Sequence, residues 1–238
     1  MTVKVLLFEF LGTFSLVFFT CFSRINNEED RFTVAMTVFF LVSGLVYIFK
    51  PHSGAIFNPF ISISLTATKQ VSVSALPLHL LGQLAGSAAA ALAVFGLNSR
   101  GPNNIEYYGL PRLHVESKWE ASFLEALSLF ILATVHCLFS RNQKAPKNAS
   151  GAAIGFAYLV SFAATSHMTG GCANFAFVFG PSFLEKYFQD YLFLIISHFT
   201  GAALGTAFYT TMLGPSYVAE DNADFGVEPT KRKLLTTQ

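Results

Sequence analysis

The residues of this sequence with the clearest chemical potential are two asparagines, Asn58 and Asn174, which lie 116 positions apart. Each opens a short apolar stretch just after a glycine-containing turn. Asparagine is a favoured helix N-cap, and Pro59 suits the first helical position because it lacks an N–H group. A helix N-terminus carries partial positive charge, and the asparagine amide can donate hydrogen bonds beside it. The pair predicts a site that binds a small polar molecule and repels cations; the alternative is that both residues only cap helices.

Two glutamates, Glu9 and Glu125, are also 116 positions apart, and each lies inside an apolar stretch. A charged side chain in the middle of a membrane helix costs at least ~2.5–3.5 kcal/mol, so such residues face the protein interior and accept hydrogen bonds there. A scaffold role is favoured because the two glutamates have the same separation as the two asparagines, as expected of equivalent residues in two similar halves. The alternative is a proton relay with His136 or His198, which are remote from them in sequence.

The elements that must position these side chains are predicted from length and hydropathy. Six apolar stretches are long enough to cross a bilayer core of about 30 Å as helices, and two shorter ones predict re-entrant half-helices. The six are residues 5–22, 32–49, 76–97, 121–139, 149–166 and 191–213, and the short pair is 58–67 and 174–184.

Composition supports a membrane protein. Of the 238 residues, 53% are hydrophobic and 12% are charged, against about 25% charged in soluble domains. The net charge of +1 indicates no nucleic-acid partner. Three cysteines at no metal-ligand spacing predict neither a metal site nor a disulfide framework. With no nucleophile–base pair and no phosphate loop, we expect no enzyme, no catalytic residue and no cofactor.

The common offset predicts an internal repeat. Gly86 and Gly201 lie 115 positions apart, close to the offset of the asparagines and glutamates. Because each half holds three spans, the copies must be inverted in the membrane. The prediction is a transmembrane domain over residues 1–213, with halves of about 1–100 and 119–213, followed by a polar tail, 214–238. Nine of the fifteen Lys and Arg residues fall on the side of the termini, which predicts both ends on the inner side.

Several segments resemble the aquaporins, or major intrinsic proteins. Residues 9–14 read EFLGTF, 53–60 SGAIFNPF and 170–181 GGCANFAFVFGP. The first is similar to the opening of the family, and the others to its two Asn-Pro-Ala loops. The resemblance implies an all-α membrane protein with six transmembrane helices and two re-entrant half-helices in an inverted repeat. It also implies pore asparagines at Asn58 and Asn174, and loop bracing by Glu9 and Glu125.

The sequence departs from the family in its signature loops and filter. Phe60 stands where the first loop has alanine, whereas in the second loop Phe175 replaces proline and Ala176 is kept. Phe177 occupies the place of the arginine that narrows the filter in conducting members. The other filter positions, carried over by offset, are Val38, Phe162 and Cys172. These four side chains have almost no hydrogen-bonding capacity, and hydrophobic constrictions gate by dewetting.

Two functions therefore stay open. One is a channel for water or a small neutral solute with an atypical, phenylalanine-rich pore that is either open or closed. The other is a non-conducting structural subunit of a larger membrane assembly. The expected partners are the lipid bilayer and either identical copies, a tetramer by resemblance, or other subunits. Plasma membrane and organellar membrane, including mitochondrial, are not distinguished.

Overall fold

The computed structural model describes residues 2–27, 30–98, 108–114, 117–141 and 145–213, and within these ranges it contains helices and no β-strand. The first half contributes α1 (Thr2–Asn26), α2 (Arg31–Ser53), α3 (Pro59–Ala67) and α4 (Leu76–Asn98). The second contributes α5 (Lys118–Arg141), a 3₁₀ turn (Lys147–Ala149), α6 (Ser150–Thr169), α7 (Ala176–Glu185) and α8 (Tyr191–Phe208), which continues into a π-helical turn (Tyr209–Leu213). The predicted tail, 214–238, lies outside the described residues.

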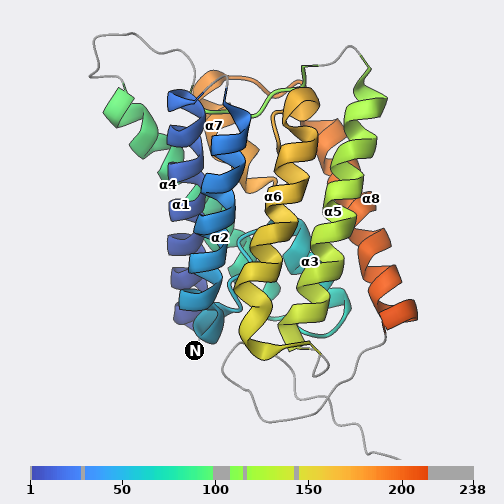
Figure 1. Cartoon of the computed structure of the whole chain (residues 1–238). Coiled ribbons are helices and arrows are strands. Elements are labelled where there is room, and N and C mark those ends of the chain that lie inside the picture. The colour runs from blue at the N-terminus through green and yellow to red at the C-terminus, as the bar shows by residue number, and fades with distance from the viewer. Residues whose placement is uncertain (1, 28–29, 99–107, 115–116, 142–144, 214–238) are drawn as a thin grey trace, which may run out of the picture.

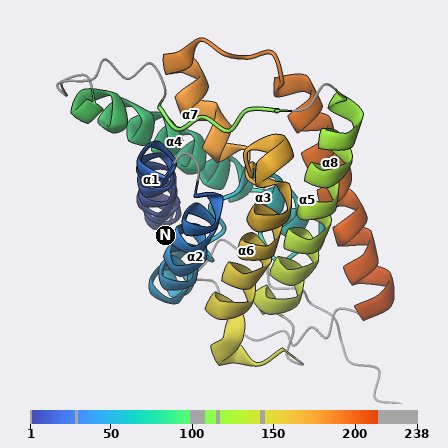
Figure 2. The same cartoon turned by 45° about the horizontal axis from the view of Figure 1, so that its top comes forward.

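The helices pack as two related halves. In the first half α1 lies against α4, and in the second α5 lies against α8, while α2 and α6 pair across the two halves. The short helices α3 and α7 occupy the lower and upper parts of the bundle in Figure 1, and Figure 2 shows the same arrangement from a tilted view. Each short helix also packs on the other half, α3 on α8 and α7 on α4. The predicted all-α architecture with two half-helices is confirmed.

Equivalent glycines end the helices that lead into the half-helices. Gly54 follows α2 with φ +91°, and its N–H bonds to the carbonyl of Lys50. Gly170 follows α6 with φ +73°, and its N–H bonds to the carbonyl of Ser166. A left-handed residue after a helix is favoured as glycine because no Cβ opposes it. The chain therefore leaves both helices in the same way and turns back toward the interior.

Small residues let the long helices approach closely. A Cβ atom added at Gly86 would lie 2.5 Å from the Phe10 carbonyl oxygen of α1. At the repeat-related Gly201, a Cβ would collide with the Ala126 carbonyl of α5. The small residues of the third and sixth spans thus make contacts within the chain, to the first and fourth spans.

The surface of the bundle suits lipid. Among the described residues, five helices are long and apolar enough to cross a bilayer: α1, α2, α4, α5 and α8 with its π turn. The remaining long helix, α6, lies along α2 and carries Ser, Thr and His in its last turns, which lowers its hydropathy. Large apolar side chains point outward from these helices, among them Phe40 (64% exposed) and Phe123 (68% exposed). Such a surface would be unfavourable in water, so the chain is a multi-pass integral membrane protein.

Candidate functional site

Glu9 lies at the centre of the first half and is fully buried. Its Oε2 accepts hydrogen bonds from the Phe57 N–H (2.9 Å) and from Gln83 Nε2 (2.7 Å). Its Oε1 accepts from the Ser53 hydroxyl (2.6 Å) and the Ile56 N–H (3.1 Å). These donors come from the last residue of α2, from the loop before α3 and from α4. The carboxylate therefore bonds directly to the loop that leads into α3, and its bracing role stays a prediction.

Glu125 makes the equivalent contacts in the second half. Its Oε2 accepts from the Ala173 N–H at 2.8 Å and lies 3.0 Å from His198 Nε2. Its Oε1 accepts from the Cys172 N–H at 3.3 Å and from the Thr169 hydroxyl. His198 takes the place that Gln83 has beside Glu9, so it is a bonding partner of the glutamate despite its distance in sequence.

The braced loops hold backbone conformations that most residues avoid. Phe57 and Ala173, which precede the two asparagines, have φ values of +52° and +43°. A non-glycine residue in this region costs of order 1–3 kcal/mol and persists only where surrounding contacts enforce it. The N–H groups of these two residues are the ones held by Glu9 and Glu125.

The two asparagines face each other in the middle of the bundle. Asn58 Nδ2 donates to the Ala173 carbonyl (3.1 Å), and Asn174 Nδ2 donates to the Phe57 carbonyl (2.8 Å). Each side-chain oxygen accepts a bond from its own half-helix, from the Phe60 N–H (3.2 Å) and the Ala176 N–H (3.0 Å). The asparagines thus cap their half-helices and join the two loops, so the capping and pairing interpretations are not exclusive.

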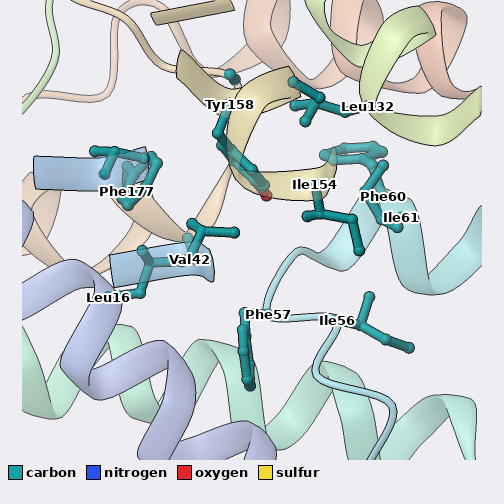
Figure 3. Close-up of a cluster of buried hydrophobic side chains, with 14 of the residues drawn as sticks. Leu16, Val42, Ile56, Phe57, Phe60, Ile61, Leu132, Ile154, Tyr158 and Phe177 are labelled. Carbon is teal, nitrogen blue, oxygen red and sulfur yellow. The ribbon is translucent and has the colours of Figure 1, made fainter. Parts of the chain in front are cut away.

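Tyr158 of α6 completes this arrangement. Asn58 Nδ2 donates its second hydrogen bond to the Tyr158 hydroxyl at 3.2 Å, and the tyrosine is 1% exposed. Figure 3 shows its hydroxyl oxygen directed into the middle of the buried cluster, toward the side on which Phe57 and Phe60 lie. The amide hydrogens of Asn58, which could bind a passing solute, are both committed to protein oxygens.

The predicted signature and filter side chains are distributed over two clusters. Phe162 and Phe177 meet edge to face with ring centroids 6.2 Å apart, and Val38 belongs to the same buried cluster. Phe60 and Phe175 also meet edge to face, at 6.1 Å. The Cys172 side chain instead packs with Leu110, Val178 and Leu194, apart from the Phe162 cluster. The two filter phenylalanines are therefore together, and the cysteine side chain belongs to a different environment.

The sequence did not indicate that a guanidinium joins these rings. Arg24 of α1 has its Cζ 4.9 Å from the centre of the Phe162 ring and 5.4 Å from that of Phe177. Its Nη1 donates to the Gly109 carbonyl (3.0 Å), and its Nη2 donates to the carbonyls of Gly170 (3.2 Å) and Gly171 (2.8 Å). The filter region therefore has a buried cation that the predicted residue set lacked.

A cavity of about 610 Å³ lies beside Arg24 and Phe162; we call it the mouth cavity. It is lined by Arg24, Asn27, Arg31, Val34, Leu110, Arg112, His114, Phe162, Ser166, His167 and Gly170. Among these described residues none is acidic, and neither asparagine of the pair takes part in the lining. The cavity thus reaches Arg24 and Phe162 but not Asn58 or Asn174.

One buried group has the composition of a metal site. Ligand atoms of Glu125, Cys172 and His198 lie within 4.8 Å of one another. The glutamate oxygens, however, already accept bonds from two backbone N–H groups and a hydroxyl and contact His198. The carboxylate is therefore satisfied by the protein itself, and this group carries no argument for a metal.

Comparison with known proteins accounts for the geometry. The sequence profile of the major intrinsic protein family matches residues 1–209. The chain belongs to the major intrinsic protein family. Among curated relatives, Aquaporin NIP3-1 of Arabidopsis thaliana is 28% identical over 220 residues, which cover 87% of this chain and 67% of the relative. Nodulin-26 of Glycine max is 27% identical, covering 84% of this chain and 74% of the relative.

The solved structures show the same fold. An aquaglyceroporin of Plasmodium falciparum superposes with a TM-score of 0.76 at 20% sequence identity, covering 90% of this chain and 98% of that chain. The aquaporin fold and the predicted family are thus confirmed. In this major intrinsic protein, the buried asparagine pair lies where the two half-helices of the fold begin.

Proposed function

We propose that this chain is a channel for water or a small neutral solute, and that Tyr158 closes its pore in the conformation described above. Membership of the aquaporin and glycerol-facilitator family supports the transport class. The two half-helix N-termini and the asparagine pair supply the positive potential and the hydrogen-bond donors that such a path uses.

The observation that carries the closed state is the bond from Asn58 Nδ2 to the Tyr158 hydroxyl at 3.2 Å. Water in single file must replace the hydrogen bonds that it loses on leaving bulk solvent. The phenol oxygen already occupies a donor that would serve this purpose. Conduction then requires the Tyr158 side chain to turn away from Asn58, so we expect low permeability in the unmodified protein.

The phenylalanines add to this barrier. Phe162, Phe177 and Phe60 are all buried near the path, and rings cannot accept the strong hydrogen bonds that water loses. The same features favour a second candidate function, a non-conducting subunit of a membrane assembly, because a permanently held Tyr158 would leave no path. We further propose that the chain forms homo-oligomers and keeps both termini on the inner side of its membrane.

Solute uptake by liposomes containing the purified chain tests the proposal. Vesicles are mixed with an iso-osmotic solution of glycerol or urea, and swelling is followed by light scattering. Uptake or water flow above that of protein-free vesicles supports a channel and identifies its solute. If correctly folded protein gives the same permeability as protein-free vesicles, both as wild type and as Tyr158→Ala, the result would instead support the structural subunit.

A further inference from the structure

The mouth cavity is lined by Arg24, a residue of α1 with only 5% of its surface exposed. We propose that Arg24 is the specificity-determining residue of the channel: it rejects cations and offers a hydrogen bond to small uncharged molecules with an acceptor oxygen. This inference rests on the proposed channel function and names the solute class that the mouth accepts.

The contacts of Arg24 fix its position without neutralising its charge. Three backbone carbonyls, those of Gly109, Gly170 and Gly171, accept hydrogen bonds from its two terminal nitrogens. Within the part of the chain that the structure describes, no carboxylate forms an ion pair with it. Carbonyl dipoles solvate a guanidinium but leave its net charge, so a full positive charge remains in the wall of the mouth cavity.

The two rings beside Arg24 shape what can pass it. Phe162 and Phe177 lie within cation–π distance of the guanidinium, which favours one position of the group. Phe177 is held at the start of α7 and Phe162 in α6, so both rings belong to rigid elements. A solute at this point meets two apolar ring surfaces and one cationic group, which disfavours ions with their hydration shells.

One terminal N–H of Arg24 is left for a solute. The three carbonyls take one hydrogen of Nη1 and both of Nη2, so among the described residues the second Nη1 hydrogen has no acceptor, while Nε is enclosed by protein. A buried donor without a partner is costly, and a molecule with an acceptor oxygen would relieve that cost. Water, urea and polyols carry such an oxygen, whereas a metal cation or hydronium ion offers none and is repelled.

The rest of the mouth cavity reinforces the positive potential. Arg31 and Arg112 line it together with Arg24. Arg112 is paired with Glu185, so its charge is largely compensated. The pKa of His114 in the cavity wall is consistent with this potential. It lies below the ordinary value of 6.5, first because the side chain is partly buried and second because Arg31 and Arg112 are positively charged. An approaching cation is therefore disfavoured before it reaches Arg24.

The test separates the charge of Arg24 from its bracing of the loops. Arg24→Lys keeps the charge but loses the planar fork, whereas Arg24→Gln keeps a donor and loses the charge. Each variant is reconstituted in liposomes with the wild type and with Lys4→Gln, which removes the charge of an exposed residue near the start of α1, outside the mouth cavity. Both Arg24 variants are also made on a Tyr158→Ala background, so that a closed tyrosine does not hide the effect. Water flow is measured by osmotic shock, and cation leak by a pH-sensitive dye and by potassium-driven potentials.

We expect Arg24→Gln to raise proton or potassium leak by more than about tenfold at preserved water flow, whereas Arg24→Lys and Lys4→Gln should keep the low cation leak of the parent protein. Equal leak in Arg24→Lys and Arg24→Gln would overturn the inference, because loop bracing alone would then explain both. Unchanged cation rejection in a water-conducting Arg24→Gln protein would overturn it while leaving the channel intact. Absence of water flow in every background, including Tyr158→Ala, would overturn the proposed function and the inference with it.

Discussion

Replacement of Tyr158 by alanine should open the pore, and the structure sets the expected size of the effect. In the described conformation the hydroxyl takes one amide hydrogen of Asn58 at 3.2 Å. A water molecule passing this point lacks a donor worth about 1–3 kcal/mol. Alanine both frees this donor and removes the ring from the path. Since 1.36 kcal/mol corresponds to a tenfold change in rate, the freed donor should raise water permeability by about 5- to 150-fold once the ring is gone.

Tyr158→Phe is the matched control, because it removes the hydroxyl and keeps the ring. A water molecule occupies about 30 Å³ in the liquid, which is more than one hydroxyl oxygen vacates. Asn58 would then have an unpartnered N–H, at a cost of about 1–3 kcal/mol in stability, while the path stays blocked. We therefore expect a lower unfolding temperature for Tyr158→Phe and no gain in permeability.

The assay is stopped-flow light scattering on proteoliposomes, with permeability expressed per inserted protein. Tyr158→Ala should also cost about 3–5 kcal/mol if the space stays empty, and less if water fills it. Folded Tyr158→Ala protein with the permeability of the wild type would refute the assignment of the tyrosine as the closing group. A gain in Tyr158→Phe equal to that in Tyr158→Ala would show that the ring is not the obstacle.

Three further predictions concern the scaffold and the filter. Glu125→Gln turns an acceptor into a donor facing backbone N–H groups, so we expect the free energy of unfolding to fall by about 3 kcal/mol or more. The unfolding temperature in detergent should fall accordingly, whereas Glu120→Gln, at an exposed position, should leave it unchanged. Gly201→Ala drives a methyl group into the Ala126 carbonyl and should cost about 1–3 kcal/mol, whereas Gly44→Ala, with open space around its Cβ, should be neutral or stabilising in the same thermal assay. Phe177→Arg places a second guanidinium about 5 Å from Arg24, and the repulsion should lower the free energy of unfolding by about 3 kcal/mol at an effective dielectric constant near 20. In a double-mutant cycle, Arg24→Gln should restore this stability; no restoration would contradict the prediction.

The sequence predicted the fold because its signals repeat. Asn58 with Asn174 and Glu9 with Glu125 share one offset, and the spans between them are long and apolar, so inverted halves followed from length and periodicity alone. The offset of Gly86 and Gly201 also relates Gln83 to His198, which bond to the glutamates of their own halves. That pairing was therefore accessible from the repeat, although the distance in sequence argued against it.

The parts of the site that break the repeat were not predicted. The position equivalent to Tyr158 is Val42, which has no hydroxyl, so no offset marked the tyrosine. Arg24 corresponds to Ser140, and hydropathy ended the first span at residue 22, which assigned Arg24 to a loop. In the structure α1 continues to Asn26 and directs the guanidinium inward. There, backbone carbonyls replace the hydrogen bonds that water would make, and two rings contact the faces of the group.

The cysteine of the predicted filter illustrates another limit. An offset carried over from a family fixes the place of a residue along the chain but not the direction of its side chain. Cys172 follows a glycine with φ +67°, and its side chain packs with Leu110, Val178 and Leu194. The conformation of the loop, which depends on Glu125 and the turn glycines, decides which side chains face the path.

The central claim, a path for small uncharged molecules along the asparagine pair with Tyr158 as its closing group, is tested most directly by osmotic shrinkage of proteoliposomes in an impermeant solute at several temperatures. We predict water permeability modestly above the lipid background for the wild type, and a clearly higher permeability with a lower activation energy for Tyr158→Ala. Permeability and activation energy equal to those of protein-free vesicles in both proteins, with correct insertion demonstrated, would contradict the claim.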